Sequence, residues 1–138
     1  MLYLLDTDHV SLWQRGQPFV VARMNIVFES DVTVSVLTYQ EQLRGRLAVI
    51  QRAETNAELA IAYLRLRQMQ EFFCAIRITD FDEAAAETYE VLRKKYRRLD
   101  RMDLRIAAVA LTQNAILVTR NRKDFDQIEG LSLEDWSA

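Results

Sequence analysis

The sequence predicts an α/β protein in which helices cover both faces of a mostly parallel sheet, and three observations lead to this class. Short runs rich in Val, Ile and Leu recur along the chain, as in strands that are buried on both faces. Longer segments between these runs repeat their apolar residues at helical spacing. Strands and helices therefore alternate, which is typical of parallel sheets with helical crossovers.

In the first half of the chain we expect, in order, strand 3–5, helix 8–16, helix 18–29, strand 32–36 and helix 38–45. The strand segments are short and apolar or β-branched, which favours buried strands. The first helix has Asp8 as its candidate N-cap and Gly16 as its candidate end. Pro18 suits the first turn of the second helix. The third helix is expected to extend to Gly45.

In the second half we expect, in order, helix 55–73, strand 76–79, helix 80–97, helix 103–112 and strand 116–119. The longest helix carries one apolar stripe, formed by Leu59, Ala62, Leu66, Met69 and Phe73. Asp80 and Glu83 have the spacing of a capping box that opens the next helix. That helix has one apolar face, formed by Ala85, Tyr89, Leu92 and Tyr96. The alanine-rich segment predicts a short helix, and the apolar segment after it predicts a strand covered on both faces.

Length and composition exclude several classes of protein. A chain of 138 residues is expected to form a single domain, residues 1–138. Three glycines are too few for a dinucleotide-binding fingerprint or a P-loop. The lone Cys74 and the lone His9 exclude a disulfide scaffold and a tetrahedral zinc site. Neither a signal peptide nor an apolar run of membrane-spanning length is present, so we expect a cytoplasmic domain with no membrane contact.

Four acidic residues from distant segments fall where a parallel sheet would bring them to one edge. They are Asp6 after the first strand, Glu41 one helical turn past the second, Asp103 at the start of the alanine-rich helix and Asp124 after the last strand. Ligands bind at the carboxyl ends of the strands in such sheets, so we expect these acids to converge there. Asp8, Asp100 and Asn121 lie near them in sequence.

A cluster of carboxylates needs a partner, because two charges about 4 Å apart repel by about 4 kcal/mol at an effective dielectric constant of 20. Either some of the acids bind protons or a cation neutralises them. Oxygen ligands suit Mg²⁺ or Mn²⁺. Phosphodiester hydrolysis uses such an ion to activate water and to offset charge on the leaving oxygen.

Most of these acids also have a purely structural interpretation. Asp8 and Asp103 fit ordinary N-caps. Glu41 in a first helical turn complements the helix dipole, and Asp124 lies in a charged stretch where solvated acids are common. Asp6 is the exception, since an acid directly after an apolar strand rarely serves packing.

Four blocks of the sequence together resemble the motifs of a known family: LYLLDTDHVSL (2–12), VSVLTYQEQLRGRL (34–47), RMDLRIAAVAL (101–111) and ILVTRNRKDFDQIEGLSLEDW (116–136). Their order and separation resemble the conserved blocks of PIN-domain ribonucleases, and most closely those of VapC-type toxins from toxin–antitoxin operons. The resemblance spans nearly the whole chain. It implies a three-layer α/β/α fold and Mg²⁺- or Mn²⁺-dependent cleavage of RNA. It also implies a cognate antitoxin and a homodimer as partners.

The resemblance assigns roles to individual residues. Asp6, Glu41 and Asp103 match the family's first three catalytic and metal-binding acids, and Asp124 in NRKDF matches the usual fourth. Thr7 and Thr119 match hydroxyl residues that line such sites, with an ordinary turn or strand threonine as the alternative, and Asn121 matches a helper of the fourth acid. Asp8 is a further candidate for a supporting role, either as an extra ligand or as a solvated neighbour. The chain departs from the commonest family pattern at two positions, since many relatives have Asn in place of Asp8 and Gly in place of Asp100.

The net charge of −2 argues against a broad attraction to nucleic acid, but the basic residues are clustered. Two basic runs flank the segments of the third and fourth acids, and the RNA contacts expected from them are Arg98, Arg101, Arg120 and Arg122. Arg44 and Arg46, around Gly45, form a third candidate contact. The alternative is a solvated helix end whose cations complement the helix dipole.

The leading function is therefore an endoribonuclease toxin, and two others stay open. One is a PIN nuclease with the same chemistry in RNA processing, and the other is an inactive PIN-fold interaction domain. Intact acids at all four positions argue against the inactive domain. The longest helix carries more apolar residues than one covered face requires, which fits either core packing or an interface with a second copy or an antitoxin.

Overall fold

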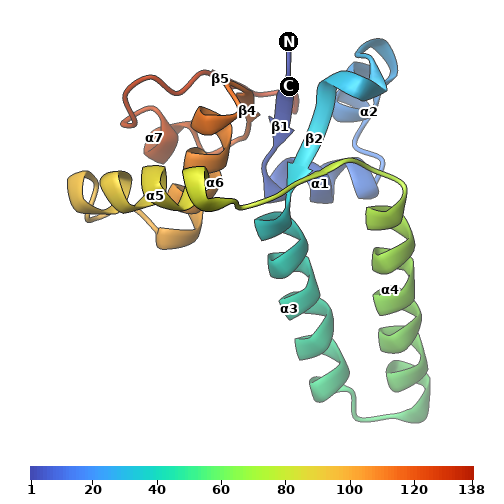
Figure 1. Cartoon of the computed structure of the whole chain (residues 1–138). Helices are drawn as coiled ribbons and strands as arrows, with labels where there is room; N and C mark the ends of the chain where they lie inside the picture. The colour runs from blue at the N-terminus through green and yellow to red at the C-terminus, as the bar shows by residue number, and fades with distance from the viewer.

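The computed structural model describes all of residues 1–138 and has a five-stranded parallel sheet at its centre, with the strand order β3-β2-β1-β4-β5 (Figure 1). The strands are β1 Tyr3–Leu5, β2 Val32–Ser35, β3 Ile78–Thr79, β4 Ile116–Val118 and β5 Leu133–Glu134. The predicted α/β class with a parallel sheet is confirmed. The short edge strand β5 was not predicted, because two residues give no periodicity to detect.

Seven helices surround the sheet. They are α1 Thr7–Gln14, α2 Pro18–Ile26, α3 Val36–Arg52, α4 Asn56–Cys74, α5 Glu83–Lys95, α6 Arg101–Thr112 and α7 Arg122–Phe125, with a 3₁₀ turn at Glu29–Asp31. In Figure 1, α3 and α4 form a hairpin that extends well beyond the sheet. No helix is both long and apolar enough to span a lipid bilayer.

The sheet separates two apolar cores, because successive side chains of a strand point to opposite faces. Leu4 of β1 and Leu117 of β4 pack in the core beneath α5 and α6. Leu5 and Val118, the next residue of each strand, pack in the core formed with α1, α2 and the end of α4. The layers are therefore helix, sheet, helix, as the three-layer prediction requires.

Four predictions about helix ends were wrong. The second helix was expected to reach Glu29, but α2 ends at Ile26. The N-cap of α1 is Asp6 rather than Asp8, since the Asp6 carboxylate accepts the Thr7 backbone N–H. Helix α3 continues past Gly45 to Arg52, where the residues after the glycine are good helix formers. The N-cap of α5 is Asp82 rather than Asp80, because Asp82 accepts the backbone N–H of Ala85.

The alternative interpretation of Asp103 as an N-cap is also wrong. Asp100 caps α6 and accepts the backbone N–H groups of Met102 and Asp103. Asp103 lies in the first turn of the helix, with its carboxylate free for other contacts. Gly16, by contrast, ends α1 as predicted, with a φ of 75° that favours glycine.

Candidate active site

Asp6 sits at the carboxyl end of the central strand β1 and is nearly buried, with 6% of its surface exposed. Its Oδ1 accepts the Thr7 backbone N–H at 2.8 Å, and its Oδ2 accepts the Thr119 hydroxyl at 2.8 Å. Burial raises the pKa of Asp6 to about 7, and repulsion from Asp8 and Asp103 adds to the rise. A buried acid that two donors hold in place is poised to bind either a proton or a cation.

Glu41 reaches the same region from the second turn of α3. The Thr7 hydroxyl donates a 2.7 Å hydrogen bond to its Oε1. The Thr38 hydroxyl lies 3.0 Å from that of Thr7, and because the only proton of Thr7 goes to Glu41, Thr38 is the donor. Thr7 therefore joins the first and second acids, through its backbone N–H on one side and its hydroxyl on the other.

Asp103 and Asp124 are joined by Asn121, which begins the turn into α7. The Asn121 amide donates to Asp103 Oδ2 at 3.4 Å and to Asp124 Oδ2 at 3.3 Å. Its backbone N–H donates to the Thr119 hydroxyl at 3.0 Å. Since Thr119 also bonds Asp6, one chain of hydrogen bonds links all four predicted acids.

The electrostatics of Asp103 show that these acids act on one another. Burial raises the pKa of Asp103 to about 6. The next largest cause is repulsion from Asp100, followed by Glu41 and Asp124. Negative charge is thus concentrated at one edge of the sheet, and a cation placed there would favour the ionised acids.

The fit to a metal ion rests on the chemistry of the donors. All four acids offer oxygen ligands, which suit Mg²⁺ or Mn²⁺. As the side chains stand, no three acids, histidines or cysteines form a group that could hold an ion by themselves. Mg²⁺ usually keeps several waters and binds through one or two carboxylates and substrate phosphates, so a loose group of acids suits it.

Asp8 is tied to the rest of the protein. Its Oδ1 accepts Nδ1–H of His9 at 2.9 Å, while Nε2 of that fully buried imidazole accepts the Trp136 backbone N–H at 3.1 Å. Its Oδ2 accepts the Arg120 backbone N–H at 3.1 Å. Asp8 therefore anchors the C-terminal segment and the loop after β4 beside Asp6. Sequence reasoning missed this role of His9, which no local pattern signals.

The four predicted RNA-contacting arginines differ in their surroundings. Arg120 Nε lies 3.8 Å from Asp8, and Arg122 Nε lies 3.9 Å from Asp126. Arg98 and Arg101 form no ion pair and flank Asp100, the cap of α6. All four therefore stand near segments that carry the acids.

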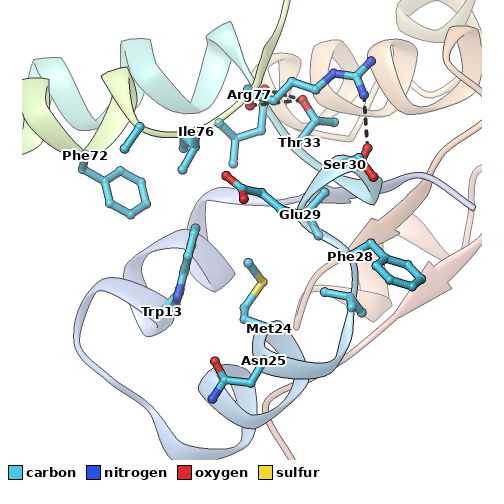
Figure 2. Close-up of a pocket in the computed structure, with 14 residues that line it drawn as sticks. Trp13, Met24, Asn25, Phe28, Glu29, Ser30, Thr33, Phe72, Ile76 and Arg77 are labelled. Atoms are coloured by element: carbon cyan, nitrogen blue, oxygen red, sulfur yellow. Dashed lines mark hydrogen bonds between the residues drawn. The ribbon is translucent and has the colours of Figure 1, made fainter.

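A separate cleft lies on the α2 side of the sheet and has a volume of about 870 Å³. Figure 2 shows Trp13, Met24, Phe72 and Ile76 around it. The rings of Trp13 and Phe72 meet edge to face, with centroids 5.2 Å apart. Phe28 at the rim is 77% exposed, so this mostly apolar cleft has an apolar edge in solvent.

Comparisons with known proteins agree with this fold. Residues 3–131 match the family model described as PIN domain. Ribonuclease VapC2 of Rickettsia felis is 36% identical, with 99% of this chain and 98% of that protein covered. Ribonuclease VapC1 of Haemophilus influenzae is 28% identical, with 99% of both chains covered. A toxin-antitoxin complex from Klebsiella pneumoniae contains a chain of the same fold, with a TM-score of 0.70, 23% identity and 94% of both chains covered.

Proposed function

The chain belongs to the PIN domain family, and on that premise we propose that it is an endoribonuclease that acts as the toxin of a toxin–antitoxin pair. The main support for the nuclease part of the proposal is a chain of hydrogen bonds that links Glu41, Asp6, Asp103 and Asp124. The names of the two VapC ribonucleases support it. We further propose that residues 1–138 act as one catalytic domain.

We expect the reaction to depend on Mg²⁺ or Mn²⁺. The four acids would hold the ion directly or through water, consistent with their oxygen donors and with the raised pKa values of Asp6 and Asp103. When bound, such an ion lowers the pKa of water and offsets charge on the leaving oxygen. Thr7, Thr119 and Asn121 orient the acids, so their role is to position rather than to react.

The partner of a toxin must bind a surface of this chain, and the apolar cleft of Figure 2 is suited to a protein segment. We propose that an antitoxin segment packs apolar side chains into this cleft, against the Trp13–Phe72 pair. The aromatic side chains of the cleft, which have few rotatable bonds, would supply contact area at low entropic cost. The toxin-antitoxin complex from Klebsiella pneumoniae supports a partner of this kind, since one of its chains shares this fold.

A second copy of the chain is the other proposed partner. The α3–α4 hairpin carries exposed apolar side chains, among them Leu47, Val49, Leu59 and Tyr63. We propose that these exposed side chains are covered in a dimer, because burial removes apolar surface from water. We expect the purified chain to sediment as a dimer and a Tyr63→Lys variant to sediment as a monomer.

The nuclease proposal is tested with purified protein and RNA, in Mg²⁺, in Mn²⁺ and in EDTA. We expect cleavage with either ion, none in EDTA, and a loss on the order of 10²-fold or more in Asp6→Asn. Asp80→Asn removes an exposed acid in the loop before α5 and serves as the charge-matched control. No cleavage by folded protein that is free of antitoxin would contradict the proposal.

The toxin part needs a separate test in cells. Expression of the wild-type chain should arrest growth, and expression of Asp6→Asn at the same level should not. Growth arrest by both proteins would show that the effect does not depend on the nuclease site. Cleavage in vitro without growth arrest would instead favour a PIN nuclease in RNA processing.

A further inference from the structure

A polar groove of about 1010 Å³ opens directly from the acid site and runs between α1, α3 and α4. Thr7 and Glu41 lie at the acid end of the groove and also line its wall. The far wall is formed by α4, at the level of Arg65 and Gln68. A chain bound at the acids could therefore continue into this groove without leaving the protein surface.

Three arginines line the groove, and each comes from a different bordering segment: Arg15 directly after α1, Arg46 on α3 and Arg65 on α4. None of them lies within ion-pair distance of an acid, whereas Arg67, Arg93 and Arg120 elsewhere are all paired. Glu41 is the only acid that lines the groove. The groove therefore has an excess of positive charge beside the negative site.

Arg46 gives the clearest sign of a missing partner. Its Nε is buried and has no hydrogen-bond partner, the only such buried side-chain nitrogen or oxygen in the chain. Buried donors in proteins are almost always satisfied, by protein groups, water or a ligand. Because this nitrogen is closed off from solvent, an acceptor in the groove reaches it only when the Arg46 side chain turns toward the groove that it lines. Guanidinium groups match phosphate oxygens in geometry.

The position of Arg46 relative to the acids also fits a phosphate. Arg46 is the fifth residue after Glu41 on α3, which places it about 7.5 Å further along the helix axis. Between them lies Gly45, and a Cβ atom added there would meet no protein atom within 4 Å. The helix surface is thus open at this point, where the backbone of a ligand can approach closely.

From these observations we infer that the groove binds the ribose–phosphate backbone of RNA on one side of the bond to be cleaved, with Arg46, Arg65 and Arg15 on successive phosphates. The inference rests on the proposed nuclease function, because the acid end of the groove fixes where the strand must pass. RNA is favoured over an acidic protein segment, since Thr7 and Glu41 join the groove to the acid site and a strand held at the acids can continue into it. The contacts reach phosphates, so they position the strand without reading its sequence.

The test measures RNA binding in EDTA, where cleavage cannot interfere. Fluorescence anisotropy with a labelled single-stranded 12-mer is recorded for the wild type and for Arg46→Gln/Arg65→Gln over a range of salt concentrations. Each lost phosphate contact on a single strand reduces the salt slope of log K by about 0.7, so we expect the slope to fall by about 1.4. Affinity at 0.1 M salt should fall about tenfold or more.

A matched control separates the effect of a reduced net charge from the effect of losing contacts in the groove. Arg52→Gln/Arg67→Gln removes two charges from the same two helices, but from residues that do not line the groove. We expect that control to change the slope by less than half as much. Unchanged circular dichroism and melting temperature would show that all variants fold.

Equal slopes in the groove variant and the control would overturn the inference and leave the arginines to a protein partner. Cleavage in Mn²⁺ is scored separately, with the same RNA. A wild type that binds with the expected slope but never cleaves would contradict the nuclease proposal and uphold the groove. A wild type that cleaves RNA while the groove variant binds RNA normally would uphold the nuclease proposal and contradict the groove inference.

Discussion

The Thr119 hydroxyl donates a 2.8 Å hydrogen bond to Oδ2 of Asp6, and both side chains are buried. Thr119 follows β4 and Asp6 follows β1, two strands that pair directly. The central acid is therefore fixed by its neighbouring strand as well as by its own. The same hydroxyl accepts the Asn121 backbone N–H, and the Asn121 side-chain amide donates to both Asp103 and Asp124.

Replacing Thr119 by Val should leave the shape of the core intact and remove this hydrogen bond. Because the bond favours the ionised form of Asp6, we expect the pKa of Asp6 to rise further above about 7. At pH 8 the free energy of unfolding should fall by about 1.5–3 kcal/mol. Thr112→Val, which removes a hydroxyl bonded only to its own helix, is the control. An unchanged titration of Asp6 by NMR would contradict this role of Thr119.

Asp6 should also make the stability of the metal-free protein depend on pH. The pKa of Asp6 is about 7 in the fold against an ordinary value of 3.8, so between these values the folded state holds a proton that the unfolded state has lost. Stability should therefore fall as pH rises from about 4 to 7 and should level off above that range. Since a tenfold change in proton affinity corresponds to about 1.4 kcal/mol, Asp6 alone should lower the free energy of unfolding by at most about 4 kcal/mol.

The variant Asp6→Asn should lack this contribution. In EDTA at pH 8 we expect it to be more stable than the wild type, with the difference vanishing toward pH 4. Urea denaturation at several pH values measures the effect. Mg²⁺ should stabilise the wild type at pH 8 and leave Asp6→Asn nearly unaffected. A wild type that is the more stable protein in EDTA at pH 8 would refute burial as the origin of the raised pKa.

Gly45 offers a prediction about stability alone. It lies inside α3, and a Cβ atom added there meets open space. Glycine costs about 0.5–1 kcal/mol relative to alanine inside a helix, so Gly45→Ala should raise the free energy of unfolding by about that amount. Thermal denaturation measures this gain. A loss of stability would mean that α3 is bent or crowded at this position.

Much of the fold could be predicted from the sequence because its signals are local. The strands β1, β2 and β4 are short and apolar or β-branched, and the stripe of α4 repeats at helical spacing. Helix ends were harder to predict. Asp6 and Asp8 are both residues that commonly cap helices. Asp6 is the cap because its backbone is still extended where α1 begins, whereas Asp8 lies inside the helix. Similarly, Asp82 and Asp80 compete for α5, and hydrogen-bond geometry decides.

The acids of the site could also be placed from the sequence, since the rule about the carboxyl ends of parallel strands is topological. The groups that hold them could not. The bond between Thr7 and Glu41 spans 34 residues, and the bond between Thr119 and Asp6 spans 113. The alignment of Arg15 and Arg65 along one groove likewise depends on how α1 and α4 pack against α3. Such contacts follow from tertiary structure and leave no periodic pattern.

The most direct test of the central claim compares Asp103→Asn with Asp100→Asn in single-turnover cleavage of one RNA in Mn²⁺. Both variants lose one negative charge at the start of α6, and asparagine still caps the helix at position 100. We expect a loss on the order of 10²-fold or more for Asp103→Asn and a change of only a few fold for Asp100→Asn. Full cleavage by Asp103→Asn, or an equal loss in both variants, would contradict the claim that the four linked acids form the catalytic site.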